Sequence, residues 1–145
     1  MSEYKKSHKL ILDKADQADL GEVTVKQFMN KNCIKLKPNY TIKATIETFR
    51  IHHISGAPVV DFQDKIIGVI SEYDLLIQAA TGPMTAPISY KNEITSVYLE
   101  TQLKEVLKIL YKQKLKWMPV VNKENFIQGV ISRIDVLNFI ASHSE

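Results

Sequence analysis

The sequence has few features that would stabilise a fold other than a buried core. It contains one cysteine, Cys33, so no intramolecular disulfide can form. Its apolar runs are only a few residues long, whereas a membrane-spanning helix needs about 20 residues. Residues 1–22 are polar, and they contain no long apolar segment followed by a small-residue cleavage site. We therefore expect a soluble, cytoplasmic protein without a signal peptide or a membrane span.

Short motifs of catalysis and metal binding are also absent from the sequence. It has no P-loop, no GxGxxG, no HExxH and no GxSxG element. His52 and His53 are adjacent, but no carboxylate or cysteine lies nearby at metal-ligand spacing. Cys33 lacks the neighbouring cysteine or histidine of a reactive thiol and is expected to pack as a small apolar residue. The sequence thus predicts neither an enzyme nor a metal site.

Charge of one sign is scarce too. The formal net charge is +3 and the pI is about 8.9, and acidic residues are interleaved with the lysines over most of the chain. The densest basic region is residues 104–116, where five lysines lie largely on a predicted helix. The other positions of this helix carry apolar residues, so a solvated face explains the lysines. The sequence does not predict binding to nucleic acid.

What the sequence does contain is an internal repeat. Residues 58–76 recur without a gap 61 positions later as residues 119–137, and ten of the 19 aligned pairs are identical. Such a repeat predicts two copies of one supersecondary unit. Between the copies, residues 81–92 hold two prolines and a glycine and cannot form one helix. We divide the chain into a tail or short helix (1–22), a first repeat (23–80), a linker (81–92) and a second repeat (93–145).

The order of elements within each repeat predicts the fold class. Apolar residues recur at helical spacing after Thr41 and again over residues 101–113, and short β-branched runs follow each helix. In the first repeat the expected strands are 33–37, 57–62 and 65–70, and the expected helices begin at Thr41 and Ser71. The second repeat follows the same order, with strands at 93–99, 117–121 and 126–131. We predict an α+β fold of two pseudo-symmetric repeats, each a small three-stranded sheet with helices.

One motif ends the last predicted strand of both repeats: a glycine, two β-branched residues, a serine and, three positions on, an aspartate. The pairs are Ser71 with Asp74 and Ser132 with Asp135. At a helix N-terminus, free N–H groups and a hydroxyl favour a phosphate, and a carboxylate one turn on can hold ribose hydroxyls. The same pattern is also a close variant of the capping box, which satisfies the helix's own amides. Spacing alone leaves both interpretations open.

The two repeats resemble the halves of a tandem cystathionine-β-synthase (CBS) domain pair, also called a Bateman module. The resemblance rests on HHISGAPVVDFQDKIIGVISEYDLL and KLKWMPVVNKENFIQGVISRIDVL, and it covers about residues 23–141. It implies a regulatory module that binds AMP, ADP or ATP, or in some members S-adenosylmethionine, and that does not catalyse a reaction. It also implies that the motif serines contact phosphate and that the motif aspartates hold the ribose.

The resemblance further implies that the base lies in an apolar slot lined by residues of the opposite half. One site would combine the motif Ser132, Arg133 and Asp135 with Cys33, Ile34, Ser55, Gly56, Ala57 and Pro58. A second site would combine Ser71 and Asp74 with Ile94, Thr95, Lys116, Trp117 and Met118. In the first site Gly56 leaves room for a ring, whereas in the second its counterpart Trp117 either fills the slot or offers a stacking face. Beside the phosphate position, the first site has Arg133 and the second has Glu72. We therefore expect one competent site, at Asp135, and a weaker or empty one at Asp74.

The expected function is an adenine-nucleotide sensor that acts through a homodimer and an unidentified effector enzyme or transporter. The dimer would use apolar residues of the two motif helices: Leu75, Leu76, Ile77, Val136, Leu137, Phe139 and Ile140. The alternative is a protein-interaction or structural dimer whose clefts have lost their ligand, as Trp117 and the capping explanation would allow. An enzyme resembling inosine monophosphate dehydrogenase is disfavoured, because its barrel and its cysteine loop are absent.

Overall fold

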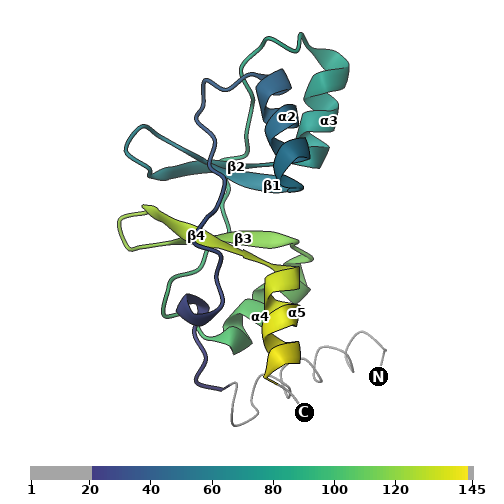
Figure 1. Cartoon of the computed structure of the whole chain (residues 1–145). Helices are drawn as coiled ribbons and strands as arrows, with labels where there is room; N and C mark the ends of the chain where they lie inside the picture. The colour runs from purple at the N-terminus through teal and green to yellow at the C-terminus, as the bar shows by residue number, and fades with distance from the viewer. Residues whose placement is uncertain (1–20, 144–145) are drawn as a thin grey trace. The chain divides into compact units, whose positions relative to one another are not determined.

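The computed structural model describes residues 21–143, so most of the predicted tail at 1–22 lies outside the described residues. The helices and the two hairpin strands of each repeat follow the predicted order (Figure 1), and the α+β fold class is confirmed. The first repeat contains α2 (Ile42–His52), β1 (Gly56–Val60), β2 (Ile66–Ser71) and α3 (Glu72–Thr81). The second contains α4 (Leu103–Gln113), β3 (Trp117–Val121), β4 (Ile127–Ser132) and α5 (Arg133–Ser142). A single 3₁₀ turn, η1 (Val25–Gln27), precedes them.

The described residues divide into two compact units that do not follow the repeat boundaries. The α2–α3 unit comprises residues 32–95 and 123–127, and the α4–α5 unit comprises the rest of the described residues. Residues 21–31, at the start of the first repeat, therefore pack with the second one. Leu103 N–H donates to Val23 O (2.9 Å), and Val25 N–H donates to Thr101 O (2.9 Å). Likewise, Ile42 N–H donates to Ala86 O (2.9 Å), which ties the linker to the first repeat.

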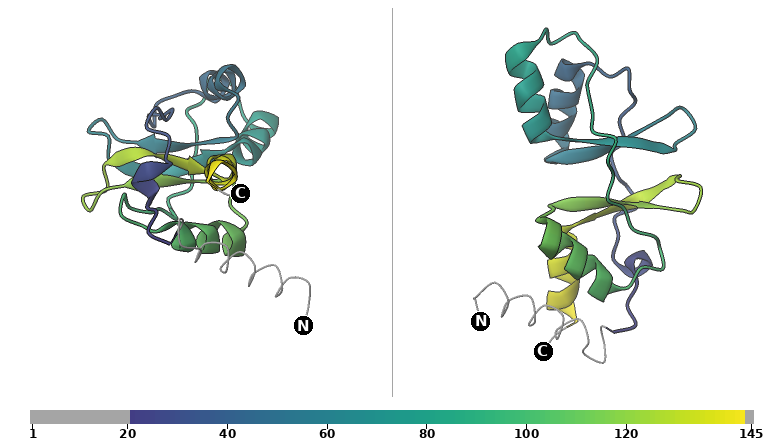
Figure 2. Two further views of the ribbon diagram at one scale, coloured as in Figure 1. Left: turned by 60° about the horizontal axis from the view of Figure 1, so that its bottom comes forward. Right: turned by 180° about the vertical axis from the view of Figure 1, so that it is seen from behind.

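Each unit is built on a β-hairpin covered by two helices. β1 and β2 pair antiparallel, with Gly56 opposite Ser71, and β3 pairs with β4. A tight turn joins the two strands of each hairpin: Asp64 lies in the left-handed region (φ 67°), as does Asn125 (φ 68°), 61 positions later. Aspartate and asparagine tolerate this conformation better than other non-glycine residues. In Figures 1 and 2, α2 and α3 lie side by side on one face of the β1–β2 hairpin.

The third strand predicted for each sheet shortens to one parallel bridge. In the first repeat Leu36 N–H donates to Pro58 O (3.0 Å), and Leu36 O accepts from Val60 N–H (2.8 Å). Val97 makes the equivalent pair of bonds with Pro119 and Val121. In the first repeat Pro38 follows soon after Leu36 and cannot donate a hydrogen bond to a longer ladder. In both repeats the next helix begins six positions after the bridge, at Ile42 and at Leu103. The sheets themselves have two strands each.

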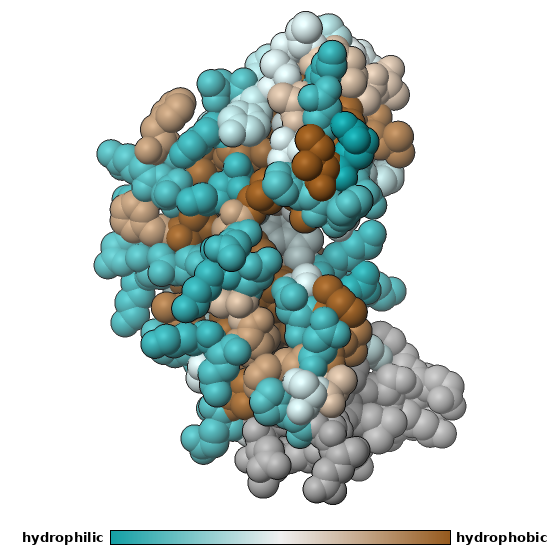
Figure 3. Space-filling model, in the orientation of Figure 1, coloured by the Kyte–Doolittle hydropathy of each residue, from teal (hydrophilic) through white to brown (hydrophobic). Residues whose placement is uncertain are grey.

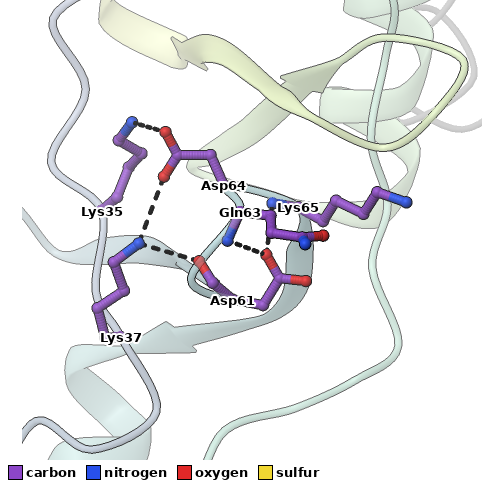
Figure 4. Close-up of polar contacts among 6 residues, drawn as sticks. All are labelled: Lys35, Lys37, Asp61, Gln63, Asp64 and Lys65. Carbon is purple, nitrogen blue, oxygen red and sulfur yellow. Dashed lines mark hydrogen bonds and ion pairs between the residues drawn. The ribbon is translucent and has the colours of Figure 1, made fainter.

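Lysines of this third segment hold the turn of the first hairpin (Figure 4). Lys35 Nζ contacts Asp64 Oδ2 at 3.0 Å, and Lys37 Nζ lies 3.4 Å from Asp64 Oδ1 and donates to Asp61 O (2.9 Å). The hydrogen bond from Lys35, followed by the other lysine contacts, lowers the pKa of the Asp64 carboxyl. Asp61 Oδ1 accepts from the backbone N–H groups of Gln63 (2.8 Å) and Lys65 (2.9 Å). This network fixes the hairpin turn.

Two apolar clusters form the cores of the units. Both include the residue before the motif serine, Ile70 in one and Ile131 in the other, together with the first leucine or valine after the motif aspartate. The α2–α3 cluster consists of Leu36, Ile42, Phe49, Ala57, Val59, Ile70, Leu75 and Ile88. The α4–α5 cluster consists of Val23, Val25, Val97, Leu103, Val106, Leu110, Met118, Val120, Ile131 and Val136. Each motif is thus anchored on both sides by buried residues. No described helix is long and apolar enough to cross a membrane.

A segment from outside the hairpin crosses the outer edge of each second strand. Val69 of β2 exchanges two backbone hydrogen bonds with Lys91 of the linker (2.8 and 3.0 Å). Val130 of β4 exchanges two with Asn30 (2.9 and 3.0 Å). Since Asn30 and Lys91 are 61 positions apart, they are equivalent in the repeat. We call residues 28–30 and 89–91 the crossing segments.

Candidate functional site

Both Ser-x-x-Asp motifs lie where a strand turns into a helix, and both form a capping box. Ser71 closes β2 and is the N-cap of α3; Ser132 closes β4 and is the N-cap of α5. Asp74 N–H donates to Ser71 Oγ (3.2 Å), and Ser71 N–H donates back to Asp74 Oδ2 (3.0 Å). The capping interpretation of the motif is therefore confirmed. Capping uses one carboxylate oxygen, Oδ2, and leaves Oδ1 available to other partners in each repeat.

At Asp74 the remaining hydrogen-bonding capacity is largely occupied. The hydroxyl of Ser71 donates to Asp74 Oδ2 (3.0 Å), so this oxygen carries two hydrogen bonds. Lys91 Nζ lies 3.5 Å from the other oxygen, Oδ1. The Asp74 side chain is 14% exposed and that of Lys91 is 68% exposed. Any further donor to this carboxylate has to share Oδ1 with an ammonium group.

At Asp135 the surroundings differ. Ser132 N–H donates to Asp135 Oδ2 (3.1 Å), and Asp135 N–H donates to Ser132 Oγ (3.1 Å). Within residues 21–143, the Ser132 hydroxyl does not donate to the Asp135 carboxylate, and no cation lies beside that carboxylate. Asp135 therefore lacks both of the additional contacts that Asp74 makes. An ionised carboxylate can accept about four hydrogen bonds. Asp135 therefore retains acceptor capacity at Oδ1, and Ser132 retains its hydroxyl hydrogen.

The entry to the first strand of each hairpin lies next to the motif of the same repeat. Glu72 N–H, at the start of α3, donates to Ser55 O (2.9 Å). In the second repeat Arg133 N–H donates to Lys116 O (2.9 Å). Each bond consumes one of the amides that a helix N-terminus leaves unpaired. The backbone donors still exposed at these helix ends are thus fewer than the sequence suggests.

The site residues expected from the sequence divide between the two units. Of the first group, Cys33, Ile34, Ser55, Gly56, Ala57 and Pro58 lie in the α2–α3 unit, whereas Ser132, Arg133 and Asp135 lie in the α4–α5 unit. Of the second group, Ser71, Asp74, Ile94 and Thr95 lie in the α2–α3 unit, and Lys116, Trp117 and Met118 in the other. Burial raises the pKa of the half-buried Cys33 thiol, which fits its expected role as a packing residue. Trp117 is half-buried and Met118 is buried.

Sequence reasoning missed the crossing segments and with them Lys91. The recognisable repeat is confined to 58–76 and 119–137, and residues 89–91 share no identical residue with 28–30. Extending the 61-residue offset backwards would have aligned Lys91 with Asn30, but the alignment does not reveal that Asn30 pairs with β4 and Lys91 with β2. That pairing is a long-range backbone contact without a side-chain signature.

The comparison with protein families agrees with the repeat. The CBS domain model matches this chain twice, at residues 25–80 and 88–142. The chain belongs to the CBS domain family. Of its relatives, the uncharacterized protein MJ1232 of Methanocaldococcus jannaschii is 28% identical over 132 residues, which cover 91% of this chain and 44% of that protein. The chain spans about half or less of the length of the first curated relatives it matches.

Solved structures of other CBS proteins share the fold. The structure of CBSX2 in complex with AMP has a TM-score of 0.72 at 24% identity, covering 82% of this chain and 96% of that chain. The CBS domain pair of MJ0100 in complex with 5-methylthioadenosine and S-adenosyl-L-methionine has a TM-score of 0.75 at 19% identity. It covers 84% of this chain and 98% of that chain. At these identities the likeness establishes the fold.

Proposed function

We propose that this CBS protein is a regulatory module that binds an adenine nucleotide, AMP, ADP or ATP, and does not itself catalyse a reaction. S-adenosylmethionine is the other candidate ligand. Two CBS domains in one chain support the module, and fold relatives solved with AMP or with S-adenosyl-L-methionine support the ligand class. The output would pass through contact with a separate effector, an enzyme or a transporter. A change in ligand occupancy would shift the conformation that the effector recognises.

The observation that carries the proposal is the state of the Ser132 and Asp135 side chains. The capping box fixes both side chains, yet it leaves Asp135 Oδ1 able to accept hydrogen bonds and the Ser132 hydroxyl able to donate one. A ribose offers two vicinal hydroxyl donors and a phosphate offers acceptors, which match these two groups. Arg133 adds a positive charge next to the serine, which favours an anion.

In the proposed site Cys33, Ile34, Ser55, Gly56, Ala57 and Pro58 surround the base, and Ser132, Arg133 and Asp135 hold the phosphate and ribose. The weaker second site would use Ser71 and Asp74 with Ile94, Thr95, Lys116, Trp117 and Met118. The structure of the first motif supports its weakness. Asp74 already interacts with Ser71 and Lys91, and Glu72 adds a negative charge where the second repeat has Arg133.

Binding can be tested by thermal unfolding with AMP, ADP, ATP, S-adenosylmethionine and NAD in turn. A ligand at about 100 times its dissociation constant stabilises the native state by about 2.7 kcal/mol, or roughly 5–10 °C for a chain of this size. We expect one adenine ligand to produce this shift. Asp135→Asn should abolish it, because the variant loses the charge that holds the ribose but keeps an oxygen for the cap.

Asp74→Asn is the matched control, since it makes the same change in the equivalent capping box. Without ligand, both variants should lower the melting temperature by the same small amount. With ligand, Asp74→Asn should retain the ligand-induced rise in melting temperature that Asp135→Asn loses. An unchanged melting temperature with every ligand would contradict the nucleotide proposal and favour the alternative of an interaction module without a ligand.

The exposed faces of α3 and α5 support the proposed homodimer. Leu76 is 66% exposed and Leu137, its repeat equivalent, is 59% exposed. Their neighbours Tyr73, Ile77 and Ile134 are also exposed. Figure 3 shows apolar side chains at the surface over both the α2–α3 and the α5 regions of the face in view. Apolar patches of this kind commonly mark interfaces between proteins. Of the residues predicted for the interface, Leu75 and Val136 are instead buried in the cores of their units.

Charged residues on these faces should separate the dimer. In Leu76→Lys and Leu137→Lys, an ammonium group would have to be buried without a partner, which costs several kcal/mol in a tight interface. We expect sedimentation equilibrium to show a dimer for the native chain and a monomer for the double variant. Ile51→Lys, which places the same charge at an exposed apolar position of α2 (59% exposed), should remain dimeric. A native monomer at high protein concentration would contradict the dimer.

A further inference from the structure

We propose that Lys91, in the linker between the two repeats, closes the Asp74 carboxylate to ligands and so determines that the two motifs of this chain differ. The inference rests on the proposed function, because it concerns which of the two motif aspartates can hold a nucleotide. It assigns a specificity role to a residue outside both motifs. Ser71, Asp74 and Lys91 all lie in the α2–α3 unit.

The backbone of Lys91 is held in place by the residues around it. Lys91 exchanges two hydrogen bonds with Val69. The side chain of Gln78 on α3 binds the neighbouring Ser89 through both of its amide atoms: Nε2 donates to Ser89 O (2.8 Å) and Oε1 accepts from Ser89 N–H (2.9 Å). Ile88, the next residue back, is buried in the core of the unit. A lysine on so firmly anchored a segment loses less freedom when it pairs with a carboxylate than a lysine on a loose loop would.

The ammonium group of Lys91 lies beside the Asp74 carboxylate. Lys91 Nζ lies 3.5 Å from Asp74 Oδ1, the carboxylate oxygen that the capping box does not use. Ribose hydroxyls would need this same oxygen. Because the Asp74 side chain is only 14% exposed, its charge is less screened by water than that of a surface aspartate. Lys91 and a ribose therefore compete for one acceptor.

The other repeat has an uncharged side chain at the position of Lys91. Asn30 occupies the position equivalent to Lys91: it is 61 residues earlier and makes the same pair of backbone bonds, to Val130 instead of Val69. Asparagine carries no charge and cannot form an ion pair with a carboxylate. The amide clamp differs as well, since Phe139 replaces Gln78 and its ring lies 5.4 Å, between centroids, from that of Phe28. The repeat thus places a cation beside one motif and a neutral side chain at the equivalent position of the other.

The test is isothermal titration with two probes, AMP and adenosine, in the native chain and in an Asp135→Asn background that leaves only the Asp74 motif. In that background we expect weak binding of both probes. Adding Lys91→Asn, which copies the residue of the other repeat, should tighten both by about two- to fivefold, because the competing ammonium is removed. Lys43→Asn removes another exposed positive charge, from α2 of the same unit, and should change neither affinity.

Adenosine separates competition for the carboxylate from attraction to phosphate. If Lys91 instead served a bound phosphate, Lys91→Asn would weaken AMP and leave adenosine unchanged, and this result would overturn the inference. So would equal affinities before and after the change. Failure of the proposed function has a different signature: the native chain, titrated with all the adenine ligands, would show no binding at Asp135. If the Asp135→Asn, Lys91→Asn double variant then also bound neither AMP nor adenosine, the inference would fail together with the proposed function.

Discussion

Replacing Ile131 by alanine is expected to lower the free energy of unfolding by about 2–5 kcal/mol. Ile131 is 0% exposed and lies in the core of the α4–α5 unit, one residue before the motif serine. Truncation removes buried methyl and methylene groups and leaves a cavity whose lining can relax only in part. Since the total stability of a domain is about 5–15 kcal/mol, this loss is a large share. Urea denaturation followed by circular dichroism measures it directly.

The matched control is Ile51→Ala. Ile51 lies on α2 and is 59% exposed, so the same truncation there removes little buried surface and places a better helix former in a helix. We expect a change within about 0.5 kcal/mol. Equal losses at Ile131 and Ile51 would mean that Ile131 is not in a core. Because Ile131 positions Ser132, we also expect the alanine variant to bind its ligand less tightly.

The repeat allowed the hairpins and motif helices to be predicted, because their determinants are local. Short runs of consecutive buried residues in 56–60 and 117–121, turn residues at 63–64 and serine N-caps each act within a few positions of the chain. The equivalent left-handed residues His53 and Lys114, both at φ 53°, show how closely the two copies share these local signals. A histidine or a lysine at these positions does not by itself predict the left-handed conformation from the sequence.

The parts that could not be predicted depend on contacts between distant segments. The expected third strands reduce to single bridges at Leu36 and Val97, because strand length depends on what the neighbouring segment does next. Asn30 and Lys91 of the crossing segments pair with strand residues 100 and 22 positions away, in ways that no periodicity encodes. Consequently the sequence could suggest that the two motifs differ, through Arg133 and Glu72, but it could not reveal Lys91 beside Asp74.

The two interpretations of the Ser-x-x-Asp motif are compatible once the atoms are considered. A capping box uses one lone pair of the serine oxygen and one carboxylate oxygen, and it fixes both side chains without exhausting them. A cap therefore pre-orients a carboxylate for a second role at little further entropic cost. Where additional partners take up the remaining capacity, as at Asp74, the same motif is left with a structural role.

Gly68→Ala and Gly129→Ala are expected to destabilise the protein by about 1–3 kcal/mol each, because both glycines lie under a crossing segment. A Cβ at Gly129 would lie 2.6 Å from Asn30 O and 3.2 Å from Met29 Sδ. A Cβ at Gly68 would lie 2.7 Å from Lys91 O and would overlap the ring of Tyr90. Neither glycine has a positive φ, so the requirement is space and not backbone conformation. Chemical denaturation of each variant measures the loss.

Gly82→Ala separates this steric cost from the general effect of replacing glycine. Gly82 also has no positive φ, and a Cβ there would meet only Gln78 O, at an ordinary 3.6 Å. The alanine variant should be neutral or slightly more stable, since it reduces the entropy of the unfolded chain. If Gly68→Ala matched Gly82→Ala, the linker would not be pressed against β2 in solution. In that case Lys91 would not be anchored beside Asp74, so this stability measurement also bears on the origin of the difference between the two motifs.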